Sequence, residues 1–197
     1  MADSLYLSLW FPSFETDDML PCALAVMRQF PFSKVLPGIH YLALHPVSWN
    51  EPTILERRFE PGVPPEEAVE TAADLLHEDY AYIFEAAWDL WTPASDGRVW
   101  AQSPSEVKFL VHGLEFGGGS YQQEGHIQAD FGLDSPFLQE QVKLTAEAEA
   151  RVRSNVQQLV EFTGRIEREA GASARLLWSE SEENLAQKLI ARLQRVQ

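Results

Sequence analysis

Apolar and polar residues follow a strand-like pattern in the middle of the chain, at residues 107–116 and 126–133. The first segment has apolar side chains at both odd and even positions, which is typical of a strand covered on both faces. In the second segment the odd positions are apolar and the even positions from His126 to Asp130 are polar, which indicates a strand with one buried and one solvent-exposed face. Because the glycines at 117–119 accept positive φ without steric cost, the pattern predicts a long β-hairpin over residues 106–133.

The N-terminal half alternates between strand-like and helix-like spacing. The pattern predicts strand, helix, strand, strand, helix and strand at residues 4–11, 16–30, 39–44, 54–60, 64–76 and 80–91. The last segment also continues the helical stripe before it. We favour a strand there, because the segment is rich in aromatic residues and the alternative helix of 27 residues would be unusually long. This order of elements is that of a ferredoxin-like βαββαβ unit.

The C-terminal third predicts a long helix at 136–170, because apolar residues recur there at intervals of three and four. A short strand at 174–178 and a C-terminal helix follow it. A continuous helix of 35 residues would be about 52 Å long, whereas a compact domain of this chain length is about 42 Å across. The overhanging apolar stripe favours a homodimer, in which a second copy covers it.

Together these elements predict an α+β fold with an antiparallel or mixed sheet. Residues 93–105 are rich in turn-forming residues and are the most plausible boundary within the chain. We expect one globular domain over residues 1–197, in which 93–105 joins the sub-halves 1–92 and 106–197.

The chain is strongly acidic, with a formal net charge of −15. Residues 1–92 contain 15 acidic and 4 basic side chains, so most of the excess lies in the N-terminal half. Such a charge disfavours nucleic acids and anionic membranes, because both are bound through clustered lysine and arginine. A basic protein partner fits the charge, and so does a simple role in solubility.

The single cysteine and the shortness of the apolar segments indicate the cellular compartment in which the protein is expected. Cys22 has no second cysteine with which to form an intrachain disulfide. No segment resembles a secretory signal or reaches the length of a membrane span, so we expect a cytoplasmic protein.

The glycines at 117–119 match neither a dinucleotide-binding loop nor a Walker loop, and no cofactor is expected.

Polar residues of the predicted hairpin are the best candidates for chemistry. His112, His126 and Asp130 come from paired strands, and two imidazoles with a carboxylate can bind a divalent metal or form an oriented general base. A solvated strand face explains the same residues without a site. His40 and His45 are assigned no role.

Tryptophans near the turn-rich segment are candidates for partner binding: Trp88, Trp91 and Trp100. Trp is enriched at interaction hot spots because it removes a large area from water. Core packing is the alternative, because six tryptophans in a chain of this length need apolar surroundings.

The chain contains no recognised catalytic motif, so the expected function is that of a non-enzymatic, acidic, cytoplasmic binding protein. Antitoxin-like and immunity-like neutralisers of basic toxins share its size and charge, and that comparison is by analogy alone. The alternative is a small metal- or ligand-binding enzyme with its site on the polar face of residues 106–133.

Overall fold

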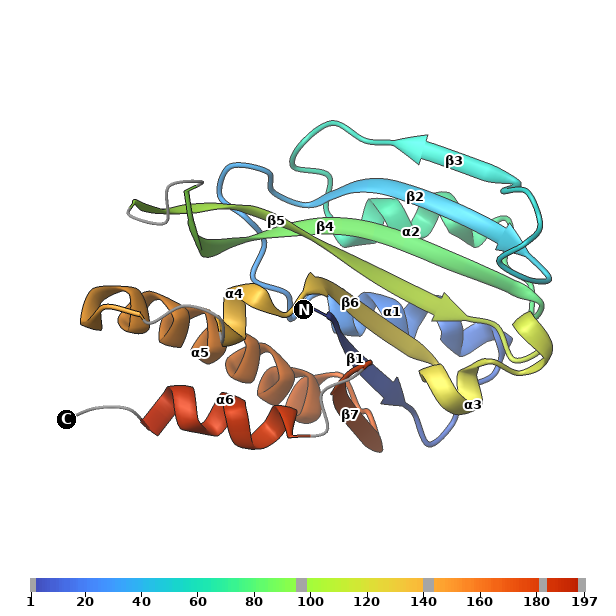
Figure 1. Ribbon diagram of the computed structural model, residues 1–197. Coiled ribbons are helices and arrows are strands. Elements are labelled where there is room, and N and C mark those ends of the chain that lie inside the picture. The colour runs from blue at the N-terminus through green and yellow to red at the C-terminus, as the bar shows by residue number, and fades with distance from the viewer. Residues whose placement is uncertain (1–2, 95–98, 140–143, 181–183, 195–197) are drawn as a thin grey trace.

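The structure, a computed structural model, describes residues 3–94, 99–139, 144–180 and 184–194. It contains one seven-stranded sheet in the order β3-β2-β4-β5-β6-β1-β7, and all neighbouring strands are antiparallel (Figure 1). The strands are β1 (Ser4–Trp10), β2 (Ile39–Pro46), β3 (Leu55–Arg58), β4 (Tyr80–Pro93), β5 (Trp100–His112), β6 (Ile127–Leu133) and β7 (Ala174–Ser179). The helices are α1 (Met19–Met27), α2 (Pro65–Ala73), α3 (Tyr121–Glu124), α4 (Ser135–Leu138), α5 (Ala146–Glu169) and α6 (Leu185–Gln194), with 3₁₀ turns η1 (Thr16–Asp18) and η2 (Phe116–Gly118). The α+β class and the antiparallel sheet are confirmed.

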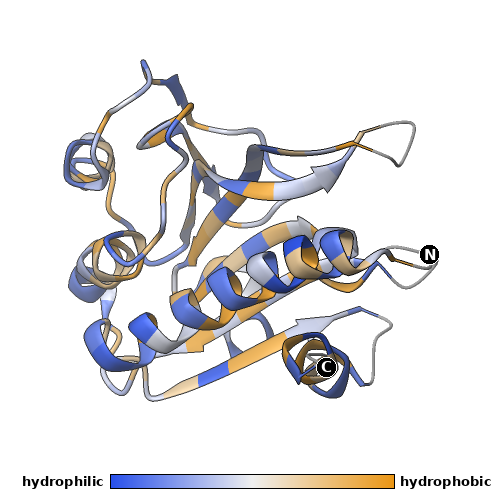
Figure 2. Ribbon diagram, turned by 90° about the vertical axis from the view of Figure 1, so that its left-hand side faces the viewer, coloured by the Kyte–Doolittle hydropathy of each residue, from blue (hydrophilic) through white to orange (hydrophobic). Residues whose placement is uncertain are grey.

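The long helices pack on a single face of the sheet, where the hydrophobic core lies. Phe30, just after α1, and Phe162 of α5 have ring centroids 5.3 Å apart. Both rings also contact Trp88 of β4 and Phe109 of β5, so the two helices share one side of the central strands. Buried residues of α2 and α6 belong to the same core cluster. The long helix that crosses Figure 2 is α5, whose apolar positions alternate with hydrophilic ones along its length. The fold is therefore two layers, a sheet and its helices.

The predicted helix over 136–170 is wrong as a continuous element. The structure has α4 at its start and the 24-residue α5 at its end, and residues 140–143 lie outside the described part of the chain. Gln139 adopts a left-handed conformation, with φ 44°, which ends α4. Thr145 caps α5 by accepting a hydrogen bond from the Ala148 N–H. At about 36 Å, α5 does not exceed the width of a compact domain, which removes the reason for predicting a homodimer.

A buried amide fixes α5 against the sheet. Asn155 is 1% exposed, and its Oδ1 accepts from the Trp91 N–H at 2.9 Å. Its Nδ2 donates to the carbonyl oxygens of Trp91, at 2.8 Å, and Pro136, at 2.9 Å. These three bonds connect α5 to β4 and to α4. They also satisfy a buried amide that would cost about 1–3 kcal/mol if it had no partners.

The ferredoxin-like arrangement predicted for residues 4–91 is not confirmed. The six elements occur in the predicted order, and residues 80–91 form strand β4 as expected. However, β1 lies between β6 and β7, and β2 pairs with both β3 and β4. Within the turn-rich segment 93–105, most of the residues that the structure describes are in strands, because β4 extends to Pro93 and β5 begins at Trp100.

The predicted antiparallel pairing is confirmed as β5 and β6, but the first strand ends at His112 instead of Phe116 and the connection contains η2 and α3. The predicted solvent-exposed face of the second strand is not confirmed. Ile127, Ala129 and Phe131 are buried in the core as predicted, whereas Leu133 is 55% exposed. The even positions His126 and Gln128 are buried too, at 8% and 6% exposed. The cause is the connection between the strands, which folds back over this end of the sheet.

Among the helices that the structure describes, none combines the length and the apolar character that a membrane span requires.

Candidate functional site

The sheet face opposite the core carries a continuous row of side chains, one from each strand. Register partners place them side by side from β7 to β3, where neighbouring strands are about 4.8 Å apart and facing side chains interact. We call it the cross-sheet row, and it consists of Trp178, Tyr6, Asp130, Lys108, Glu85, Tyr41 and Arg58.

Aromatic residues stand at both sides of the cross-sheet row. The rings of Tyr6 and Trp178 stack at 4.7 Å, and Trp178 Nε1 donates to Ser8 Oγ at 3.0 Å. At the other side, the Arg58 guanidinium lies 5.5 Å from the ring centroid of Tyr41. These contacts hold large side chains in place while leaving them partly exposed to solvent.

The centre of the row is charged. Lys108 Nζ lies 3.4 Å from a carboxylate oxygen of Glu85 and 3.4 Å from one of Glu106. Burial works against the charged form of Lys108, but the two carboxylates outweigh it, so the pKa of Lys108 lies above its ordinary value. The ammonium is therefore held as a cation between two acids.

A second row of register partners runs beside the first and is largely small or apolar. It consists of Leu176, Ser8, Gln128, Leu110, Ile83, Ala43 and Glu56. Leu110 and Ile83 are half-buried, and Leu176 is 52% exposed. We call the two rows together the open face, because the long helices α1, α2, α5 and α6 bury their apolar residues in the core on the other side.

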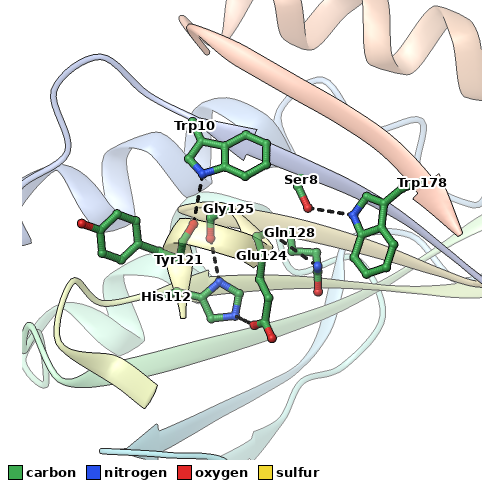
Figure 3. A network of polar contacts seen from close by, with 8 residues as sticks. All are labelled: Ser8, Trp10, His112, Tyr121, Glu124, Gly125, Gln128 and Trp178. Atoms are coloured by element: carbon green, nitrogen blue, oxygen red, sulfur yellow. Dashed lines mark hydrogen bonds and ion pairs between the residues drawn. The ribbon is translucent and has the colours of Figure 1, made fainter. Parts of the chain in front are cut away.

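One end of this side of the sheet is closed by α3 (Figure 3). Trp10 Nε1 of β1 donates to the Tyr121 carbonyl at 3.0 Å. The fully buried His112 donates from Nδ1 to the Gly125 carbonyl at 2.8 Å, and its Nε2 lies 3.3 Å from a carboxylate oxygen of Glu124. The short helix is thus fastened to β1 and β5 by polar contacts.

His126 has a structural role in the same region. Its Nδ1 accepts from the Phe11 N–H at 3.0 Å, so the ring proton of the neutral form is on Nε2. Its ring stacks on Phe14 at 4.2 Å and on Tyr121 at 4.9 Å. These contacts position the loop after β1 against α3.

The three residues predicted to bind a metal are only partly brought together. His112 and His126 are neighbours, since the His112 N–H donates to the His126 carbonyl at 2.9 Å. Asp130 lies four residues further along β6, which is about 13 Å of strand, and its Oδ1 accepts from the Gly132 N–H. Both histidine Nδ1 atoms are already hydrogen-bonded. The geometry therefore favours structural roles for the two imidazoles.

The three predicted tryptophans lie in different surroundings. Trp88 is fully buried in the core, stacked on Phe131 at 5.1 Å. Trp91 is half-buried, with the Arg151 guanidinium 4.9 Å from its ring centroid. Trp100 pairs with Pro93 at the far end of the β4-β5 hairpin. Of these three tryptophans, Trp88 fits the alternative interpretation, which was packing in the hydrophobic core.

Sequence reasoning did not identify Tyr6, Glu85 or Lys108 as site residues. A signal for Lys108 was present, because it lies between Val107 and Phe109 in an otherwise apolar run. A lysine inside such a strand marks the face that is not covered by the core. Tyr6 likewise falls on the side of residues 4–11 opposite the leucines.

Acidification is expected to destabilise the protein through its two buried histidines. Burial lowers the pKa of His112 below its ordinary 6.5, against the opposing effects of the Gly125 carbonyl and Glu124. Burial also lowers the pKa of His126, and His112 adds to that effect. Because the pKa values of both histidines are lower in the folded protein than in the unfolded chain, the unfolded chain takes up their protons first as the pH falls. The free energy of unfolding should therefore be highest above pH 6.5 and decrease below it. Urea unfolding between about pH 7 and pH 5 should show this loss.

Replacing His112 by asparagine should flatten that dependence. A matched control is Phe116→Leu, which alters packing beside the His112 ring, 6.2 Å away, without removing a titrating group. Its curve should run parallel to that of the unmodified protein. A His112→Asn curve as steep as that of the control would contradict the assignment.

Comparison of the chain with protein-family models, curated proteins and solved structures finds no match. Its function is therefore inferred from the geometry of the open face and the chemistry of its side chains.

Proposed function

We propose that the protein is a non-enzymatic binding module that holds a basic and partly apolar segment of a partner protein on its open face. The observation that supports this most directly is the one-sided packing of the longer helices, α1, α2, α5 and α6. They cover the core face, while Tyr6, Trp178, Leu110 and Ile83 remain partly exposed on the other. Partly exposed aromatic and apolar side chains on a surface that also carries charged groups are typical of interaction surfaces.

The charge of the molecule selects the kind of partner. On the open face and beside it, the described carboxylates of Glu56, Glu85, Glu106 and Asp130 exceed the cations of Lys108 and Arg58. The whole chain has a net charge of −15. Complementary charge accelerates encounter and suppresses wrong partners. A lysine- or arginine-rich segment is therefore favoured, whereas a second copy of this acidic chain is disfavoured on the same face.

An enzyme on the polar face of residues 106–133 has less support. The two histidines there are engaged in hydrogen bonds and ring stacking, and Asp130 is distant from them. Cys22 offers no ready nucleophile, because burial and the nearby Asp18 raise the pKa of its thiol to about 11. A lone, protonated thiol is compatible with the cytoplasm, the compartment of this proposal.

Selection from a displayed library of random 12-residue peptides tests the proposal without knowledge of the partner. Peptides selected on the protein should be enriched in Lys, Arg and large apolar residues, and their affinity should fall with added salt. Tyr6→Ala should weaken the selected peptides about tenfold or more, as at an aromatic hot spot. The control is Val160→Ala, which changes a 45% exposed residue of α5 on the helix side and should leave binding unchanged. Selection without basic enrichment, or binding insensitive to Tyr6, would refute the proposal.

A further inference from the structure

Three side chains from adjacent strands form a cluster beside the open face. His40 of β2, Glu85 of β4 and Glu106 of β5 each offer one ligand atom, and these atoms lie within 4.8 Å of one another. Nitrogen and oxygen ligands of a single zinc ion, each about 2.0–2.2 Å from it, are separated by about 3–4.4 Å. Small side-chain movements would therefore bring all three onto one ion.

A β-bulge places His40 in this cluster. The register between β2 and β4 shifts between Ile39 and Tyr41, so that Ile39 pairs with Ala86 and Tyr41 with Glu85. Ile39 and Leu42 both remain in the core, which leaves His40 and Tyr41 together on the opposite side. In a regular strand those two neighbours would point to opposite faces. Bulges often serve to re-aim a side chain in this way.

The His40 ring has unused binding capacity. Its Nδ1 is shielded from solvent and has no hydrogen-bond partner among the described residues. A shielded polar atom without a partner is costly, and an ion is one of the explanations for such an atom in a native protein. The imidazole that belongs to the cluster thus has a ring nitrogen that no protein hydrogen bond uses.

Lys108 shows that the two carboxylates already share a cation. Its Nζ is 3.4 Å from a carboxylate oxygen of each glutamate. The lysine side chain is 42% exposed and flexible, so it can turn into solvent when a stronger cation arrives. A divalent ion has twice the charge of the ammonium and also engages the imidazole.

We propose that His40, Glu85 and Glu106 bind one divalent transition-metal ion, of which zinc is the representative, in place of the Lys108 ammonium. One imidazole nitrogen with two carboxylate oxygens suits zinc, manganese or iron(II) better than calcium or magnesium, which prefer oxygen ligands alone. Three protein ligands leave at least one coordination position for water or an incoming group. The metal site shares Glu85, Glu106 and Lys108 with the surface proposed to bind a partner, but zinc binding is measured without any partner.

Calorimetric titration of untagged, metal-free protein with zinc chloride provides the test, in the presence of excess magnesium. One zinc ion should bind per chain. Glu106→Gln should weaken binding about tenfold or more, and His40→Ala should do the same. Lys108→Met should strengthen it by about fivefold, because the competing ammonium is gone and an exposed ion pair is worth about that factor.

The matched control is His77→Ala, which removes a 55% exposed histidine paired with Asp79 elsewhere on the chain and should not change the affinity. Glu106 is 53% exposed, so the folding of Glu106→Gln, checked by circular dichroism, is not at risk. The proposal is overturned by protein that binds no zinc. It is equally overturned by zinc binding that persists in both Glu106→Gln and His40→Ala, or that depends on His77.

Discussion

Replacing Trp88 by alanine is expected to lower the free energy of unfolding by about 3–5 kcal/mol, the cost of removing a large aromatic side chain from a close-packed core. Trp88 is fully buried and lies where three parts of the chain meet. Its ring is 5.1 Å from Phe131 of β6, 5.4 Å from Phe30 after α1 and 5.8 Å from Phe137 of α4. The cavity would therefore loosen the contact between the sheet and both helical segments.

Guanidinium unfolding followed by far-ultraviolet circular dichroism measures this change. Trp49→Ala is a matched control, because Trp49 is 38% exposed and should cost less than half as much. Trp88→Phe should also be mild, since the indole N–H has no partner among the described residues and its loss removes a buried donor. A cost below about 1 kcal/mol for Trp88→Ala would show that this core model is wrong.

Replacing Gly125 by alanine is expected to cost about 3 kcal/mol or more, through two effects that act together. Gly125 has φ 95° and ψ 156°, a region essentially confined to glycine. An added Cβ would also lie 2.8 Å from the Leu9 nitrogen and 3.0 Å from its carbonyl oxygen, so the backbone of β1 would have to move. The His112 contact to the Gly125 carbonyl would be disturbed with it.

Gly132→Ala separates the two effects. Gly132 has φ 70°, but nothing lies within 4 Å of a Cβ built there. Its substitution should cost about 1–2 kcal/mol, the penalty of a left-handed conformation alone. Thermal or chemical unfolding of the two variants side by side is the measurement. Equal losses would mean that the close approach of Gly125 to β1 does not contribute.

The kinds of local element were largely predictable. Residues 80–91 were ambiguous, yet the aromatic side chains on one parity correctly favoured a strand. The start of α2 at Pro65 was also predictable, because Pro64 and Pro65 followed by two glutamates are a strong local helix signal. Such signals act over a few residues, and nearby residues are what a sequence pattern describes.

The neighbours of each strand were not predictable. Ser8 and Trp178 are hydrogen-bonded although 170 residues separate them. The ferredoxin-like expectation assumed that β1 pairs within the N-terminal half, whereas it pairs with β6 and β7. Nothing in the alternation of residues 4–11 distinguishes these partners, because any strand with the same buried parity would satisfy it.

The candidate sites depended even more on the tertiary structure. His126 and Gln128 follow the pattern of a solvent-exposed strand face, but α3 packs over both residues and buries them. The sequence pattern gave no role to His40. A regular strand would put it opposite Tyr41, and only the bulge places both residues on one side.

The amino-acid sequence by itself determined where most helices and strands form, which parity of most strands is buried, and that the chain is acidic, because these properties follow from side-chain chemistry and spacing within single segments. The tertiary structure decided which strands are neighbours and which sheet face stays open. It also decided which distant carboxylates meet an imidazole, because each of these depends on contacts that form only when the whole chain has closed around its core.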